Sequence, residues 1–206
     1  MFKDKDIIVF DIETQNTFQE TGKSRAEAFK KLRVSIVGVY EYLTDSYKVY
    51  EEKELMELDK RFQKADLLLG FNSAGFDLPV LSNYFFTPVD RFPHLDLMTE
   101  IEKSRGHRAS LDSVAKPTLK AKKSGSGLDA IMYWKEGRMD ELKKYCLEDV
   151  RITKEVFEYG CREGKILFTS TWDFKTYEIA VNWKQDAEAL MKKASSAPQD
   201  FPSSLF

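Results

Sequence analysis

Two carboxylates stand two residues apart at the end of an apolar run. Residues 7–10 are Ile, Ile, Val and Phe, and Asp11 and Glu13 follow, separated by Ile12. Residues i and i+2 of a strand point to the same face, so the two carboxylates could share one pocket. A carboxylate at the end of a buried strand is costly unless it is paired or binds a cation. We therefore interpret the pair as part of a metal-binding or catalytic site.

A second polar group follows the short apolar stretch at residues 67–69. Asn72 stands on the expected strand-to-helix loop, and Asp77 stands at the start of the next helix, before Pro79. Both positions lie near the end of a strand. Taken alone, Asn72 would be an ordinary turn residue and Asp77 a helix-capping residue.

A third pair is separated by one helical turn. Tyr145 and Asp149 are residues i and i+4 of a predicted long helix, so the phenol and the carboxylate lie on one face and could act on one water. With nine tyrosines in an acidic chain, about one such pair is expected by chance. The pair therefore carries weight only together with the other acids.

The elements that must position these residues follow from the apolar periodicity. The pattern predicts three antiparallel strands, then a helix, a strand, a second helix and a last short strand, followed by further helices. That order indicates an α/β fold, with a mixed sheet of about five strands and helices on both faces. The strands are expected at residues 7–13, 34–40, 46–50, 66–70 and 94–97, and the helices at 25–32, 53–64, 76–86, 139–159 and from near 96 and 110.

Length and composition favour one domain. The 206 residues predict a single domain at residues 1–183, in which residues 164–183 form a hairpin extension around Trp172. Residues 184–206 are expected to be a helical end and a disordered tail, the tail beginning at 194.

Charge and cysteine content exclude several classes of protein. A net charge of -2 argues against a uniformly basic nucleic-acid binder. No apolar run approaches the roughly 18 residues of a membrane span, so we expect no membrane partner. The two cysteines, Cys146 and Cys161, form no CxxC pair and favour a reducing, cytoplasmic environment.

Taken in chain order, these groups resemble the three motifs of a known nuclease family. Residues 10–14 (Phe-Asp-Ile-Glu-Thr), residues 70–79 and the Tyr145–Asp149 pair resemble the motifs of the DEDDy branch of the DnaQ-like 3′-5′ exonucleases. The second motif is most similar to those of family-B DNA polymerase proofreading domains and of related stand-alone or helicase-associated nucleases. The sister branch carries a histidine five residues before its last aspartate, where this chain has Lys144. The resemblance spans residues 6–157 and implies a ribonuclease H-like fold.

The resemblance also implies a chemistry and the residues that perform it. Two Mg²⁺ or Mn²⁺ ions would activate a water for in-line attack on phosphorus and stabilise the leaving oxygen. Asp11 would bridge both ions, Glu13 and Asp149 would complete the water-bearing ion, and Asp77 would hold the second. Because a phenol of ordinary pKa, about 10, is protonated at neutral pH, Tyr145 would orient the attacking water. Asn72 and Phe76 would contact the last nucleotides of a single-stranded 3′ end, and nucleoside 5′-monophosphates would be released.

A local excess of basic residues follows the second motif. We interpret residues 116–127 as a mobile loop, and the wider segment as a basic flap that binds phosphates beside the metal site. Lys120, Lys122 and Lys123 are the candidate nucleic-acid contacts. Against the single acid Asp112, residues 103–123 contain Lys103, Arg105, Arg108, Lys116, Lys120, Lys122 and Lys123.

Several alternatives stay open. The motifs contain no reader of the 2′-hydroxyl, so an RNA 3′-5′ exonuclease of the same fold is an alternative to a DNA enzyme. A catalytically inactive nucleic-acid-binding module is a third hypothesis. Proofreading would require a polymerase or helicase partner. Residues 202–206 resemble sliding-clamp-binding peptides but lack their leading Gln, so a featureless tail is the alternative there.

Overall fold

A five-stranded mixed sheet forms the centre of the computed structural model, which describes residues 2, 4–120 and 127–196. The strand order is β3-β2-β1-β4-β5. β1 pairs antiparallel with β2 and parallel with β4, so it occupies the middle of the sheet. This confirms the predicted arrangement of three antiparallel strands followed by parallel additions. The strands are β1 Ile7–Thr14, β2 Val34–Glu41, β3 Ser46–Glu51, β4 Leu67–Gly70 and β5 His94–Asp96.

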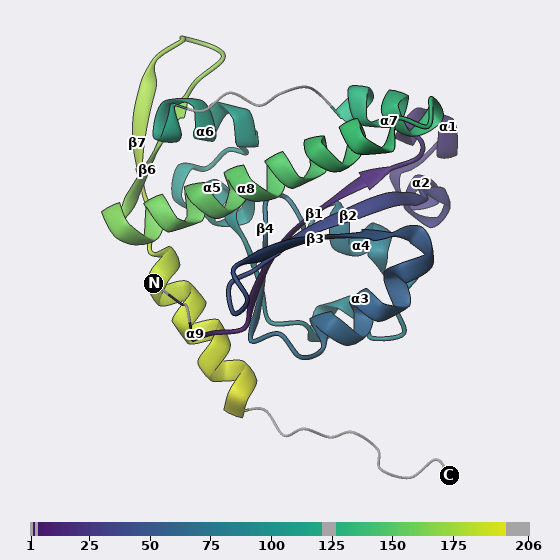
Figure 1. Ribbon diagram of the computed structural model, residues 1–206. Helices are drawn as coiled ribbons and strands as arrows, with labels where there is room; N and C mark the ends of the chain where they lie inside the picture. The colour runs from purple at the N-terminus through teal and green to yellow at the C-terminus, as the bar shows by residue number, and fades with distance from the viewer. Residues whose placement is uncertain (1, 3, 121–126, 197–206) are drawn as a thin grey trace.

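Helices cover both faces of this sheet, as Figure 1 shows. Alternation along β1 sets the two faces: Ile7 and Val9 belong to one hydrophobic cluster with α8, whereas Ile8 and Phe10 belong to another with α3 and α4. Asp11 and Glu13 have the parity of Ile7 and Val9 and therefore project from the α8 side. The helices are α1 Phe18–Thr21, α2 Arg25–Lys31, α3 Leu55–Phe62, α4 Asp77–Leu81, α5 Leu97–Arg105, α6 Leu111–Leu119, α7 Gly127–Lys135, α8 Met139–Glu163 and α9 Trp183–Ser196, with 3-10 turns at Glu52–Glu54 and Val89–Arg91.

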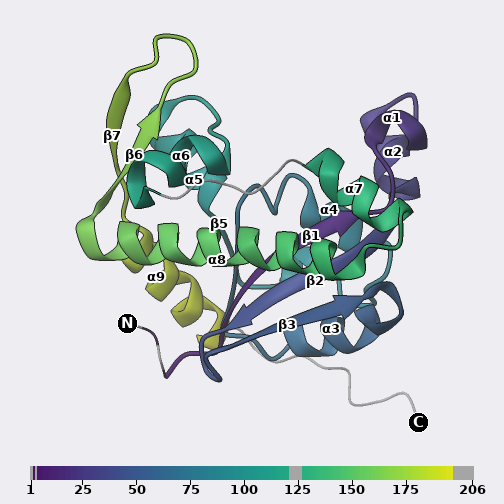
Figure 2. The same cartoon turned by 45° about the horizontal axis from the view of Figure 1, so that its top comes forward.

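A separate two-stranded hairpin follows α8, as predicted. Gly164 ends α8 in the left-handed conformation, and β6 (Lys165–Thr169) then pairs antiparallel with β7 (Thr176–Ala180). Figures 1 and 2 show the hairpin rising away from the C-terminal end of α8, alongside α6. α9 returns to the domain, where Trp183 is 1% exposed and sits against Gly160.

Three sequence-based boundaries are wrong. The helix expected at 76–86 ends at Leu81. The side chains of Ser82 and Asn83 donate to carbonyls of its last turn, and the Asp59 carboxylate accepts the N–H groups of Phe86 and Thr87. The loop expected from 116 begins later, because α6 continues to Leu119 with Pro117 inside it.

The expected tail also begins later than position 194, because α9 continues to Ser196. Residues 197–206, including the clamp-like peptide, lie outside the described residues. The short α1 and the whole of α7 have no counterpart in the sequence-based prediction. Within the described part of the chain, no helix combines the length and apolar character needed to cross a membrane.

Candidate active site

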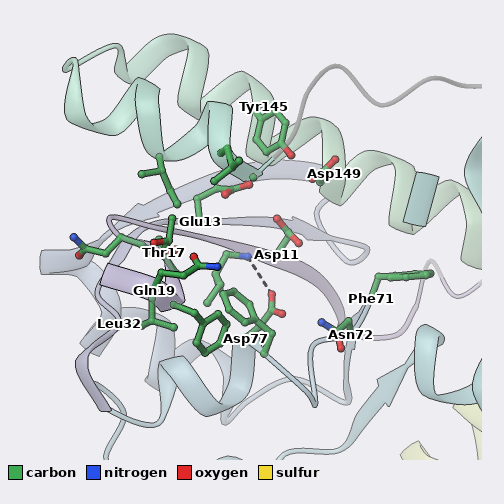
Figure 3. A pocket seen from close by; sticks show the side chains of 18 residues that line it. Asp11, Glu13, Thr17, Gln19, Leu32, Phe71, Asn72, Asp77, Tyr145 and Asp149 are labelled. Carbon is green, nitrogen blue, oxygen red and sulfur yellow. Dashed lines mark hydrogen bonds between the residues drawn. The ribbon is translucent and has the colours of Figure 1, made fainter. Parts of the chain in front are cut away.

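A cavity of about 380 Å³ opens where β1, the loop after β4 and the first half of α8 meet. Figure 3 shows the acidic side chains of β1 and α8 converging on it, with Asp77 and Asn72 on the opposite side. The structure thus brings together all of the residues that the three sequence motifs single out. They are Asp11, Glu13, Asn72, Phe76, Asp77, Tyr145 and Asp149.

The β1 carboxylates form the most compact part of the site. Potential ligand atoms of Asp11, Glu13 and Cys146 all lie within 4.8 Å of one another, which makes this cluster a possible metal site. The sequence places Cys146 on the apolar face of the long helix but gives no sign that it lies beside these carboxylates. Its thiol donates to the Asp11 carbonyl oxygen at 3.5 Å, and burial raises its pKa well above the ordinary value. The thiol therefore stays protonated, and the carboxylate oxygens are the ligands left for a hard divalent cation.

Asp77 joins the helix α4 to the central strand. It is the first residue of α4, and the N-cap position belongs to Phe76, whose side chain makes no capping bond. The Asp77 carboxylate instead accepts the Ile12 N–H at 3.1 Å across the sheet edge. Burial, with a smaller contribution from the charge of Asp96, raises the pKa of Asp77 to about 7. The capping role favoured by the isolated sequence is therefore wrong, and the carboxyl faces the cavity.

α8 supplies Tyr145 and Asp149, each only 4% exposed. Their spacing of one turn places both on the helix face that covers β1 and β2, as the sequence predicts. Close approach of α8 depends on Gly38, which lies opposite Asp11 in the ladder. A Cβ at Gly38 would lie 2.9 Å from the Cys146 Sγ and 3.2 Å from a methyl of Val150.

The loop after β4 is held by a residue that sequence reasoning placed only as a helix start. The Asp96 carboxylate accepts the N–H groups of Asn72 at 2.8 Å and Ala74 at 2.9 Å, and it also caps α5. Asn72 has a φ of +64°, a conformation that asparagine tolerates better than most residues. The Arg108 guanidinium donates to its side-chain oxygen. A polar residue at the end of a parallel strand is the signal that identified Asn72. Asp96 carries the same signal, because it ends β5, which is parallel to β4.

Two short helices that were not predicted form the rim of the cavity. α1 contributes Phe18 and Gln19, and α7 contributes Leu128 and Ile131. Phe76 packs edge-on against Phe18 at 5.6 Å between ring centroids, so this ring belongs to both the core and the cavity wall. The capping box formed by Thr17 and Glu20 is a sequence signal that could have revealed α1. We find no comparable signal for α7.

The candidate phosphate-binding lysines are only partly placed. Lys120 is exposed at the C-terminal end of α6, with a φ of +57°. Lys122 and Lys123 lie outside the described residues.

The donor set suits divalent cations of the Mg²⁺ type. Asp11, Glu13, Asp77 and Asp149 bring like charges around one small cavity, and all but Asp11 are at most 7% exposed. Clustered, desolvated carboxylates repel one another, and a hard cation with oxygen ligands offsets that repulsion.

Fold and site together define an α/β domain of the kind that hydrolyses phosphodiester bonds. The family model of the RNase_H superfamily matches residues 8–160, and the chain belongs to this superfamily. Membership and the acidic cavity together support a nucleic-acid hydrolase that uses divalent metal ions.

Among solved structures, the chain is similar to the family B DNA polymerase from the hyperthermophilic archaeon Pyrobaculum calidifontis. The TM-score is 0.57 at 22% sequence identity, over 76% of this chain and 24% of the polymerase. The chain therefore spans about a quarter of that polymerase, and at this identity the similarity supports the fold. No curated protein matches the sequence.

The close contact between Gly38 and α8 allows the position of this helix to be tested by mutation. We expect Gly38→Ala to lower hydrolysis roughly tenfold, because the added methyl would push α8, and with it Tyr145 and Asp149, away from β1. Single-turnover rates on a labelled oligonucleotide would measure the loss. The double variant Gly38→Ala/Cys146→Ala should recover much of the rate, since it removes the sulfur that the methyl meets. Unchanged activity of Gly38→Ala alone would contradict this account of the helix position.

Proposed function

We propose that this protein is a 3′-5′ exonuclease that hydrolyses single-stranded DNA and releases nucleoside 5′-monophosphates. The observation that carries the proposal is the convergence of four carboxylates and one tyrosine, from three separate chain segments, on one cavity. These residues occupy the positions that the DEDDy exonuclease resemblance assigns to catalysis. Asp11, Glu13, Asp77, Tyr145 and Asp149 are therefore our proposed catalytic residues.

The size of the cavity supports action at a chain end. Ligand pockets range over roughly 300–1,000 Å³, and this one, at about 380 Å³, suits a single terminal nucleotide. Asn72 and Phe76 both line the cavity, Asn72 on the side opposite α8, and we propose that they contact that nucleotide. Lys120, together with Lys122 and Lys123, is proposed to bind the phosphates that follow.

The four carboxylates would hold two Mg²⁺ or Mn²⁺ ions. When bound, such ions lower the pKa of a water and stabilise charge on the leaving oxygen. The Tyr145 phenol is proposed to hold the attacking water in line with phosphorus by a hydrogen bond. Ile12 N–H fixes the Asp77 carboxylate, and Arg108 fixes the Asn72 side chain, so both are oriented before substrate binds.

The test is digestion of matched DNA and RNA oligonucleotides, each labelled at the 5′ end, with Mg²⁺, with Mn²⁺ or with EDTA. We expect a metal-dependent ladder on DNA that shortens from the 3′ end. Asp11→Ala should give no ladder. The control Asp90→Ala, which removes an exposed aspartate that does not line the cavity, should cleave as the wild type does.

Other results would select the alternatives. A ladder on RNA alone would identify an RNA exonuclease of the same fold. Binding of either strand without cleavage in any metal would contradict the enzyme and favour a binding module. The similarity to one part of a polymerase favours a polymerase as the partner that would supply 3′ ends, and a helicase is the alternative.

A further inference from the structure

Two large aromatic side chains point into solvent at the tip of the β6–β7 hairpin. Trp172 is 90% exposed and Phe174 is 82% exposed. Among the large hydrophobic residues that the structure describes, only Phe86, in the loop after α4, is comparably exposed. Neither tip residue has a part in the proposed active site.

The tip is held in a defined shape. Ser170 N–H donates to the Lys175 carbonyl at 2.9 Å, and the Ser170 hydroxyl accepts the N–H groups of Trp172 and Asp173. The Asp173 carboxylate accepts the Lys175 N–H at 3.2 Å and the hydroxyl of Tyr177. Phe174 has a φ of +56°, which is unfavourable for an aromatic residue. The hairpin therefore holds both rings outward at a cost in backbone energy.

The base of the hairpin is fixed to the rest of the domain. The hydroxyl of Thr118 in α6 bonds both the N–H and the C=O of Leu167 at 3.0 Å, so α6 covers the free edge of β6. The Arg105 guanidinium at the end of α5 lies 3.7 Å over the Phe168 ring. The hairpin, α5 and α6 thus form one lobe, which we call the hairpin lobe.

The hairpin lobe carries exposed lysines that form no ion pair among the described residues, although its acidic and basic residues are balanced in number. Arg105, Lys116 and Lys175 have no ion-pair partner in the described part of the chain, and the last two are exposed. Of the two hairpin carboxylates, Glu178 pairs with Lys165 at 2.6 Å. Asp173 accepts from Tyr177, which lowers the pKa of the carboxyl, so this group keeps its negative charge. Exposed aromatic rings beside free cations are the combination that stacks bases and binds phosphates in single-stranded nucleic acid.

The hairpin lobe is connected to the active site by α8 and by Arg108. Asp149 and Gly164 lie at the two ends of a helical span of about 22 Å, at 1.5 Å per residue. Figures 1 and 2 both show α6 and the hairpin beside the C-terminal half of α8, and α7 beside its N-terminal half. A strand whose 3′ end lies in the cavity could reach the lobe with the nucleotides several positions upstream.

We propose that the hairpin lobe is a second binding site for the substrate strand, in which Trp172 and Phe174 stack on upstream bases and Lys116 and Lys175 bind phosphates. This inference rests on the proposed function for the identity of the strand. It predicts that the enzyme binds long single strands more tightly than short ones.

The test measures equilibrium binding of 5′-labelled oligothymidylates of about 4 and about 20 nucleotides in EDTA, by fluorescence anisotropy. Trp172→Ala/Phe174→Ala should weaken binding of the longer strand by about tenfold or more and leave the shorter strand unaffected. Phe86→Ala, which removes an equally exposed ring outside the lobe, should bind as the wild type does. Equal affinity of wild type and double variant for the longer strand would overturn the proposal.

The charges are tested separately. Lys116→Gln/Lys175→Gln should reduce the dependence of log Kd on log salt by about 1.4 for the longer strand, whereas the exposed control Lys60→Gln should not. If the salt dependence of log Kd is unchanged in this variant, Lys116 and Lys175 do not bind the phosphates of the strand, and that part of the proposal is wrong. Because these assays use EDTA, they do not depend on hydrolysis, and failure of the proposed activity would be seen separately in the digestion assay.

Discussion

Asp11→Ala is expected to reduce metal-dependent hydrolysis by about 10³-fold or more. The Asp11 carboxylate would be one of the groups that hold the metal ions, and its side chain lies within the compact cluster of β1. Single-turnover cleavage of a 5′-labelled strand measures the loss. The stability of the variant should be close to that of the wild type, since Asp11 is partly exposed and removing it relieves repulsion among the carboxylates.

Tyr145→Phe provides the comparison that separates the two roles. The phenyl ring keeps the packing of Tyr145, which is 4% exposed, and only the hydroxyl is lost. We expect a rate lowered by roughly 10- to 100-fold, because the bound ions still activate the water while its orientation is poorer. Equal and complete loss in both variants would contradict the division between metal binding and water positioning.

Asp77→Asn is expected to abolish activity and yet stabilise the metal-free protein at pH 8. Burial raises the pKa of Asp77 to about 7 from its ordinary value of 3.8. Between about pH 4 and pH 7 the folded chain therefore binds more protons than the unfolded chain, and this group makes the free energy of unfolding fall as pH rises. Asparagine carries no charge, and its side-chain oxygen can still accept the Ile12 N–H.

Thermal unfolding in EDTA at pH 5 and pH 8 tests this. We expect the midpoint of Asp77→Asn to exceed that of the wild type by several degrees at pH 8, and by much less at pH 5. Added Mg²⁺ should raise the wild-type midpoint more at pH 8 than at pH 5, because the cation favours the ionised carboxyl. The exposed control Asp90→Asn should show none of these differences. A variant less stable than the wild type at pH 8 would mean that the Asp77 charge is already compensated by other groups.

Local sequence patterns determined much of the fold. The β-branched and apolar run that ends at Asp11 predicts a buried central strand, and helical spacing from Leu142 to Phe157 predicts α8. Strand parity and the one-turn spacing of Tyr145 and Asp149 then determine which side chains share a face. These properties depend on residues close in sequence, so one chain suffices to read them.

Only the tertiary structure decided which faces meet. Gly38 allows α8 to approach β1, and the Ile12 N–H turns Asp77 from an apparent cap into a cavity-lining group. The end of α4 and the length of α6 depend on bonds to Asp59 and Leu167, which are far away in sequence. α7 carries no local signal that we identify. Contacts between segments separated by tens of residues leave no trace in local periodicity. For that reason the sequence indicated residues that line the cavity, but not the bonds that orient them.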